Sequence, residues 1–239
     1  MSADRIDVHT HGMADEAAAE LVAHGGFEPT GGYRISVRWT PQAALDYMDS
    51  RGRYLGHPEL EPVLAELERR QTPVFVHPED CPHIDELGFG RPSSIVEFPF
   101  DTARTITNGL YSGLFQRLPR LRLIVAHCGG ALPTLGWRIA EHTVMGRGPE
   151  DADIDPGHVE QVLRGLYYDT ALAGSRNSLL PTLEVTSADH ILFGTDWPAA
   201  PEATTDHNIQ NLMTFDGFSA DELRGVQGDN ARTLFRRFA

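Results

Sequence analysis

The sequence predicts an α/β protein of the β/α-barrel type, in which parallel strands alternate with helices. Short runs of Val, Ile, Leu and Phe alternate along the chain with segments whose apolar residues recur at helical spacing. The length, 239 residues, is close to the roughly 250 residues of a single barrel. Because no low-complexity tract or linker divides the chain, we expect one domain over residues 1–239.

Composition and charge restrict the classes of partner. The hydrophobic fraction of 41% is sufficient for a core, and the net charge of −14 gives no basic footprint for nucleic acid or an anionic membrane. No apolar run approaches the roughly 20 residues of a membrane span. Two cysteines, Cys81 and Cys128, are too few for a disulfide framework. Because the sequence enters its first predicted strand at once, we expect no signal peptide. We therefore expect a cytoplasmic protein.

The first predicted strand, residues 5–12, carries two histidines. Ile6 and Val8 supply its apolar positions, and Gly12 ends it. Side chains alternate along a strand, so His9 and His11 face the same way, about 7 Å apart. This pair either shares a divalent cation or lies in a surface turn.

The remaining elements follow from apolar periodicity and from capping residues. Pro41 after Thr40 marks a helix start, and Ser219 with Glu222 forms a capping box. We expect helices at 14–21, 40–51, 58–67, 106–118, from 131 to the loop at Gly146, up to Arg164, after Ser175 and after Ser219. We expect strands at 73–77, 121–127, 166–170 and 190–196, a strand or hairpin arm at 33–39, and a polar loop at 78–100.

Four of the five clear parallel strands end in a possible metal ligand. These residues are His9 with His11, then His77, His127 and Asp196. In a β/α barrel the carboxyl ends of the strands meet at one face and form the active site. A site of three histidines and a carboxylate with an open position suits zinc, and also manganese or iron. Each histidine alone could be an ordinary hydrogen-bonded residue, but the set together favours a metal centre.

These motifs resemble the amidohydrolase superfamily. The segments that carry the resemblance read HTH at 9–11, VHP at 76–78, AHCGGA at 126–131 and GTDWP at 194–198. The segments YMDSRG at 47–52 and EFPFDT at 97–102 add to it. They are most similar to the branch that contains aminocarboxymuconate semialdehyde decarboxylase and the resorcylate decarboxylases.

The resemblance implies a set of metal ligands and a catalytic pair. The implied ligands of a divalent metal, zinc first and manganese or iron as alternatives, are His9, His11, His77 and Asp196. His127 would be the acid or base that works with Asp196. The position of His77 and Pro78 excludes the carbamylated lysine of other branches.

The resemblance also implies residues that bind substrate. Arg38 matches an arginine that holds a substrate carboxylate, and Trp197 lines the pocket or belongs to the core. The expected activity is non-oxidative decarboxylation of an aromatic or unsaturated carboxylic acid. The alternative within the same fold is hydrolysis of a lactone, an amide or an ester.

The chain departs from the family in its length. The interval from Ile6 to Val74 is too short for four βα units of about 30 residues each, so strands two to four of the barrel are missing. The join falls near residues 52–56. An open sheet would expose edges, which a second subunit in a homodimer or the segment 33–39 would cover. The shortening also leaves a third function open, a truncated, non-catalytic barrel that binds a metal or a partner.

Overall fold

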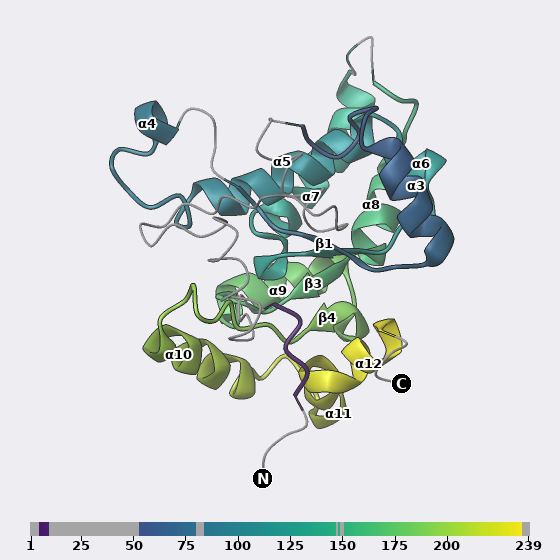
Figure 1. Cartoon of the computed structure of the whole chain (residues 1–239). Helices are drawn as coiled ribbons and strands as arrows, with labels where there is room; N and C mark the ends of the chain where they lie inside the picture. Colours follow the sequence, from purple (N-terminus) through teal and green to yellow (C-terminus); the bar gives the residue numbers. More distant parts are fainter. Residues whose placement is uncertain (1–4, 10–52, 80–83, 147, 149–150, 236–239) are drawn as a thin grey trace, which may run out of the picture.

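The computed structural model describes residues 5–9, 53–79, 84–146, 148 and 151–235. Its centre is a four-stranded parallel sheet in the order β1-β2-β3-β4 (Figure 1). The strands are β1 (Val74–Val76), β2 (Leu123–Val125), β3 (Tyr167–Asp169) and β4 (Ile191–Leu192). All three pairings are parallel, which confirms the predicted alternation.

Helices connect the strands and lie on both sides of the sheet in Figure 1. They are α3 (Glu61–Arg70), α4 (Ile84–Leu87), α5 (Glu97–Tyr111), α6 (Leu114–Arg117), α7 (Leu132–Met145), α8 (Pro156–Gly165), α9 (Arg176–Val185), α10 (Glu202–Met213), α11 (Ala220–Arg224) and α12 (Asn230–Leu234). Short 3-10 turns occupy His127–Gly129 and Ala188–His190, and a π-helical turn occupies Gly225–Asp229. The predicted capping box of Ser219 and Glu222 is present at the start of α11. Among the described residues, no helix is long and apolar enough to cross a membrane.

The N-terminal segment 5–9 lies beside β4, where Figure 1 draws it in purple. The backbone N–H of Val8 donates to Phe193 O at 2.9 Å, and that of Thr195 donates to His9 O at 3.1 Å. Of the predicted strand 5–12, the described residues 5–9 form no regular ladder, and residues 10–12 lie outside the described part of the chain. The segment 5–9 nevertheless lies next to the last strand, as the first strand of a barrel does, and it thereby brings His9 to the carboxyl end of the sheet.

The two faces of the sheet carry different side chains because successive residues of a strand point to opposite faces. Phe75, Ile124, Tyr167 and Leu192 pack with Ile6 and Val8 in one small apolar cluster, which α12 also joins. The intervening residues pack under the helices, with Leu123, Val125 and Tyr168 in one cluster and Ile191 and Phe193 in another. This small cluster lies next to His9, since the ring centroids of Phe75 and His9 are 4.9 Å apart.

Several element boundaries differ from the prediction. The helix expected at 106–118 begins at Glu97 and stops at Tyr111, because Gly113 adopts a left-handed conformation (φ 74°) before α6. Pro99 lies in the first turn of α5, where the missing N–H costs no helical hydrogen bond. The expected loop 78–100 therefore contains a short helix, α4, and the start of α5.

The part of the chain between the first predicted barrel strand and α3 lies largely outside the described residues. The segments expected at 14–21, 33–39 and 40–51 all lie outside the described residues. Within the described part of the chain, the sheet contains the four strands given above. The parallel sheet and its flanking helices are those of a barrel of this class in incomplete form.

Gly130, in the turn after β2, has a positive φ of 58° and lies against Pro99 of α5. A Cβ atom there would be 2.5 Å from Pro99 Cα, a distance that forces backbone to move. We expect Gly130→Ala to lower the free energy of unfolding by about 2–4 kcal/mol, from strain and overpacking together. Denaturant unfolding measures this change.

The matched control for this prediction is Gly165→Ala at the end of α8, where an added Cβ meets nothing within 4 Å. It should change the free energy of unfolding by less than about 1 kcal/mol. Equal effects of the two substitutions would contradict the role of the contact with Pro99.

Candidate metal centre

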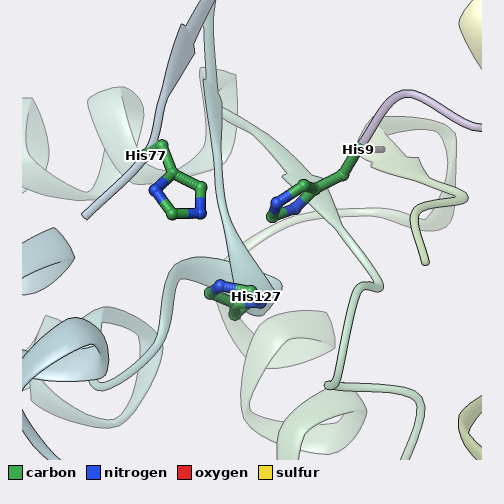
Figure 2. Close-up of side chains that lie close together, drawn as sticks. All are labelled: His9, His77 and His127. Atoms are coloured by element: carbon green, nitrogen blue, oxygen red, sulfur yellow. The ribbon is translucent and has the colours of Figure 1, made fainter. Parts of the chain in front are cut away.

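Three histidines from separate parts of the chain converge at the carboxyl end of the sheet (Figure 2). His77 follows β1, His127 follows β2, and His9 ends the docked segment. One ring nitrogen of each lies within 4.8 Å of the corresponding atoms of the other two. The ring centroids are 5.0 Å apart for His9 and His127, 5.2 Å for His9 and His77, and 5.8 Å for His77 and His127. Imidazoles at this separation are suited to share a cation.

Two of the rings are oriented by backbone carbonyls. His77 Nδ1 lies 2.8 Å from Pro78 O, and His127 Nδ1 lies 2.8 Å from Ala171 O. A carbonyl oxygen only accepts, so Nδ1 carries the proton in both rings and donates it. In the neutral imidazole the lone pair is then on Nε2, the arrangement in which a metal-binding histidine is normally held.

His9 lies between two carboxylates. Its Nδ1 is 3.2 Å from Asp169 Oδ2, and its Nε2 is 3.2 Å from Asp196 Oδ1. Burial lowers the pKa of His9, but the Asp169 and Asp196 carboxylates outweigh it and raise the pKa to about 10. Each ring nitrogen of His9 thus faces a carboxylate oxygen, and a cation that binds at Nε2 takes the place of any proton held there.

Asp7 fixes the segment that carries His9. Its Oδ1 accepts the backbone N–H of His9 at 3.0 Å and that of Thr195 at 3.2 Å, and its Oδ2 accepts the Thr195 hydroxyl. Burial raises the pKa of Asp7, although these hydrogen bonds act in the opposite direction. This carboxylate thus ties the end of the N-terminal segment to the loop after β4.

The backbone is strained at the centre. His127 (φ 56°), Cys128 (φ 53°) and Asp196 (φ 62°) all adopt the left-handed region, which non-glycine residues rarely enter. Such conformations cost about 1–3 kcal/mol each and persist where the surrounding structure imposes them, often at functional sites. For His127 the left-handed turn departs from strand alternation and directs the side chain toward the other two rings (Figure 2).

The charges at the centre fit a divalent cation. Three carboxylates, Asp7, Asp169 and Asp196, contact His9 through its backbone or its ring. Within the described ranges, no arginine forms an ion pair with Asp7 or Asp169. A cation held by the imidazoles would balance this negative charge, as bound cations do in protein sites.

The structure brings together four of the residues singled out in the sequence. His9, His77 and His127 form the cluster, and Asp196 lies against His9. Trp197 follows Asp196 and is half exposed. His11 and Arg38 lie outside the described residues. The ligand set and the catalytic roles stay predictions.

Sequence reasoning missed Asp169, which is fully buried and contacts both His9 and His127. A signal was present, because Asp169 ends the predicted strand 166–170. Of the five clear parallel strands, it was the one for which no candidate ligand was predicted. Asp7 was also missed, and nothing in the sequence distinguishes it from an ordinary acidic residue near a terminus.

Cys128, next to His127, is a buried thiol in this turn. Burial raises the pKa of Cys128, and the nearby Asp169 carboxylate raises it further. A thiol in this state is a poor nucleophile.

The chain belongs to the amidohydrolase family, because the model of that family matches residues 6–237. Over 148 residues it is 32% identical to 6-methylsalicylic acid decarboxylase of Penicillium expansum, and this alignment covers 62% of this chain and 45% of the relative. Over 187 residues it is 27% identical to gamma-resorcylate decarboxylase of Rhizobium radiobacter, covering 77% of this chain and 56% of the relative. The resemblance read from the motifs is confirmed. The chain spans about half the length of the curated relatives it matches.

Solved structures share the fold. A protein described as amidohydrolase II superposes with a TM-score of 0.72 at 21% identity, covering 97% of this chain and 99% of that one. A dihydroxybenzoic acid decarboxylase from Polaromonas, solved with manganese and the inhibitor 2-nitroresorcinol, gives a TM-score of 0.68 at 21% identity, covering 92% and 73%. The first comparison shows that the fold occurs in another chain of nearly the same extent.

The first prediction for the centre concerns metal content. Purified protein supplied with zinc or manganese should hold close to one divalent ion per chain in elemental analysis. We expect His77→Ala to weaken metal binding by more than roughly 100-fold, since loss of even an outer partner costs 10- to 100-fold. His142→Ala, on the exposed side of α7, should leave binding unchanged. Equal retention of metal by the two variants would contradict a site at the histidine cluster.

Proposed function

We propose that this chain is a metal-dependent, non-oxidative decarboxylase of an aromatic or unsaturated carboxylic acid. The observation that carries the proposal is the convergence of His9, His77 and His127, with Asp196 against His9. The names of the relatives, decarboxylases of 6-methylsalicylic acid and gamma-resorcylate, favour an aromatic acid as substrate.

The residues proposed to hold the metal are His9, His11, His77 and Asp196. The manganese in the Polaromonas structure and the histidine cluster of this chain support a divalent ion. Zinc is the proposed identity because imidazole and carboxylate ligands with an open position suit it, and manganese or iron fits the same set. When bound, the ion supplies Lewis acidity that polarises substrate oxygens.

His127 is proposed as the proton donor. With its Nδ1–H donated to Ala171 O, the ring presents Nε2 toward the centre. In decarboxylation, a protonated Nε2 gives its proton to the ring carbon that bears the carboxylate. The carbon–carboxylate bond then breaks, and its electron pair stays on that carbon as carbon dioxide leaves. His127 is left neutral, and Asp196 assists in restoring its proton.

Two further residues are proposed to bind the substrate. Arg38 would hold a carboxylate through two parallel N–H donors, a geometry particular to the guanidinium group. Trp197, half exposed and adjacent to Asp196, would cover the aromatic ring. We also propose that the protein acts as a cytoplasmic homodimer, on the charge and cysteine content of the sequence and on the expected open edge of its sheet.

The reaction is tested with a panel of substrates. We expect the metal-loaded protein to release carbon dioxide from 2,6-dihydroxybenzoate or 6-methylsalicylate, followed by gas or product analysis. His127→Asn should lower kcat by roughly 100- to 10,000-fold because the proton donor is lost. Its metal content should stay close to that of the wild type.

The same panel separates the alternatives. It includes a lactone, an amide and an ester, and acid release from these without carbon dioxide would favour the hydrolase. A protein that binds metal and turns over no member would favour a non-catalytic barrel. The solved chain of matching length shows that short extent alone does not prevent this fold. Loss of metal in His127→Asn would make that residue a ligand and refute its role as donor.

The role of Arg38 gives a separate prediction. Arg38→Gln should raise KM for the carboxylic acid by roughly 10-fold or more, since a charged hydrogen-bonding pair contributes about 1.5–3 kcal/mol. Arg34→Gln, four residues earlier in the predicted segment, serves as the control. Steady-state kinetics at fixed metal concentration measures the change, and equal KM values for both variants would refute the carboxylate clamp.

A further inference from the structure

Asp169 touches both halves of the proposed centre. Its Oδ2 lies 3.2 Å from His9 Nδ1 and accepts the backbone N–H of His127 at 3.3 Å. Its Oδ1 accepts the backbone N–H of Ala171 at 2.7 Å. The residue is fully buried at the carboxyl end of β3. One carboxylate therefore meets three N–H donors from three parts of the site.

The contact with Ala171 extends the influence of Asp169 to the ring of His127. Ala171 receives the carboxylate on its N–H and presents its carbonyl oxygen to His127 Nδ1 at 2.8 Å. Asp169 thus fixes the ring of His9 directly and orients that of His127 through Ala171. In both rings Nδ1 carries the proton, and Nε2 is the nitrogen that serves the centre.

We propose that Asp169 is the positioning residue that sets the tautomer of His9 and fixes the orientation of the His127 ring relative to that of His9. The inference rests on the proposed function, because the nitrogen it exposes on His9 is the one that would bind the metal. Asp169 touches neither substrate nor metal in this proposal. It acts through the two histidines.

The substitution Asp169→Asn tests the proposal because an amide cannot reproduce the contacts. All three neighbours of the carboxylate are donors, whereas an asparagine side chain offers one acceptor oxygen and one donor NH₂ group. If the NH₂ group faces His9, the ring must move its proton to Nε2 and lose the ligand lone pair. If the NH₂ group faces Ala171 instead, two donors oppose each other and the carbonyl that orients His127 shifts.

A second variant acts on the same contact by another route. Gly194, after β4, lies so close that an added Cβ would be 2.8 Å from His9 Cβ and 2.9 Å from Asp169 Oδ1. Gly194→Ala keeps the charge of Asp169 but separates the carboxylate from the ring. The control is Glu68→Gln, which removes the charge of another buried carboxylate that accepts a backbone N–H, that of Arg120.

The experiment measures cobalt affinity by chelator competition, together with the absorption spectrum of the bound ion. We expect Asp169→Asn and Gly194→Ala to weaken cobalt binding roughly 10- to 100-fold, the usual effect of losing a partner behind a metal ligand. The spectrum should also change, since the ligand field differs when one imidazole turns. Glu68→Gln should bind like the wild type. Wild-type affinity and an unaltered spectrum in Asp169→Asn would overturn the proposal.

A measurement on metal-free protein separates this inference from the proposed function. In ¹⁵N-histidine-labelled protein, the Nδ1–H signals of His9 and His127 are assigned by their loss in His9→Gln and His127→Asn. In Asp169→Asn we expect the His9 signal to disappear if the NH₂ group faces His9, or the His127 signal to shift if the NH₂ group faces Ala171. If the wild type binds no cobalt and the signals still change in Asp169→Asn, the Asp169 contact is supported and the metal-dependent function is refuted. If both signals are unchanged in Asp169→Asn, the positioning role is refuted whatever the metal result.

Discussion

The docking of residues 5–9 against the end of β4 is the constraint on which the rest of the site depends. Asp7 accepts the N–H groups of His9 and Thr195, while His9 O accepts from Thr195 and Asp196. These hydrogen bonds join the N-terminal segment 5–9 to the loop after β4. They fix the backbone of His9 relative to His77 and His127, which follow strands β1 and β2.

The architecture and much of the cluster could be predicted because they follow from local patterns. Apolar runs fixed the strands that carry His77 and His127, and the rule that parallel strands share a carboxyl edge placed those residues together. The early end of β4 could not be predicted: the expected strand covered residues 190–196, whereas β4 ends at Leu192. The backbone N–H of Phe193 donates to Val226 O in the π-helical turn instead of to a neighbouring strand, and no residue near Phe193 signals that change of partner.

The site was only partly predictable for a related reason. Histidines at strand ends are conspicuous in a sequence, but the acceptors that set their tautomers are not. Pro78 O and Ala171 O are backbone carbonyl oxygens, and since every residue has such an oxygen, the sequence does not indicate which ones accept from a histidine. Asp169 had a sequence signal in its strand-end position, but its contact with His9, 160 residues away in sequence, appears only in three dimensions.

The strained backbone conformation of the turn after β2 is held in place by contacts with neighbouring elements. His127 and Cys128 enter the left-handed region one after the other, and Gly129 and Gly130 continue it. Gly130 then fits against Pro99, whose carbonyl accepts the N–H of Ala131 at 3.0 Å. The start of α5 thus holds the turn, the turn holds His127, and Asp169 links His127 to His9. Because each contact fixes the next, the geometry of the centre is a property of the packed sheet and helices together, rather than of the histidine motifs alone.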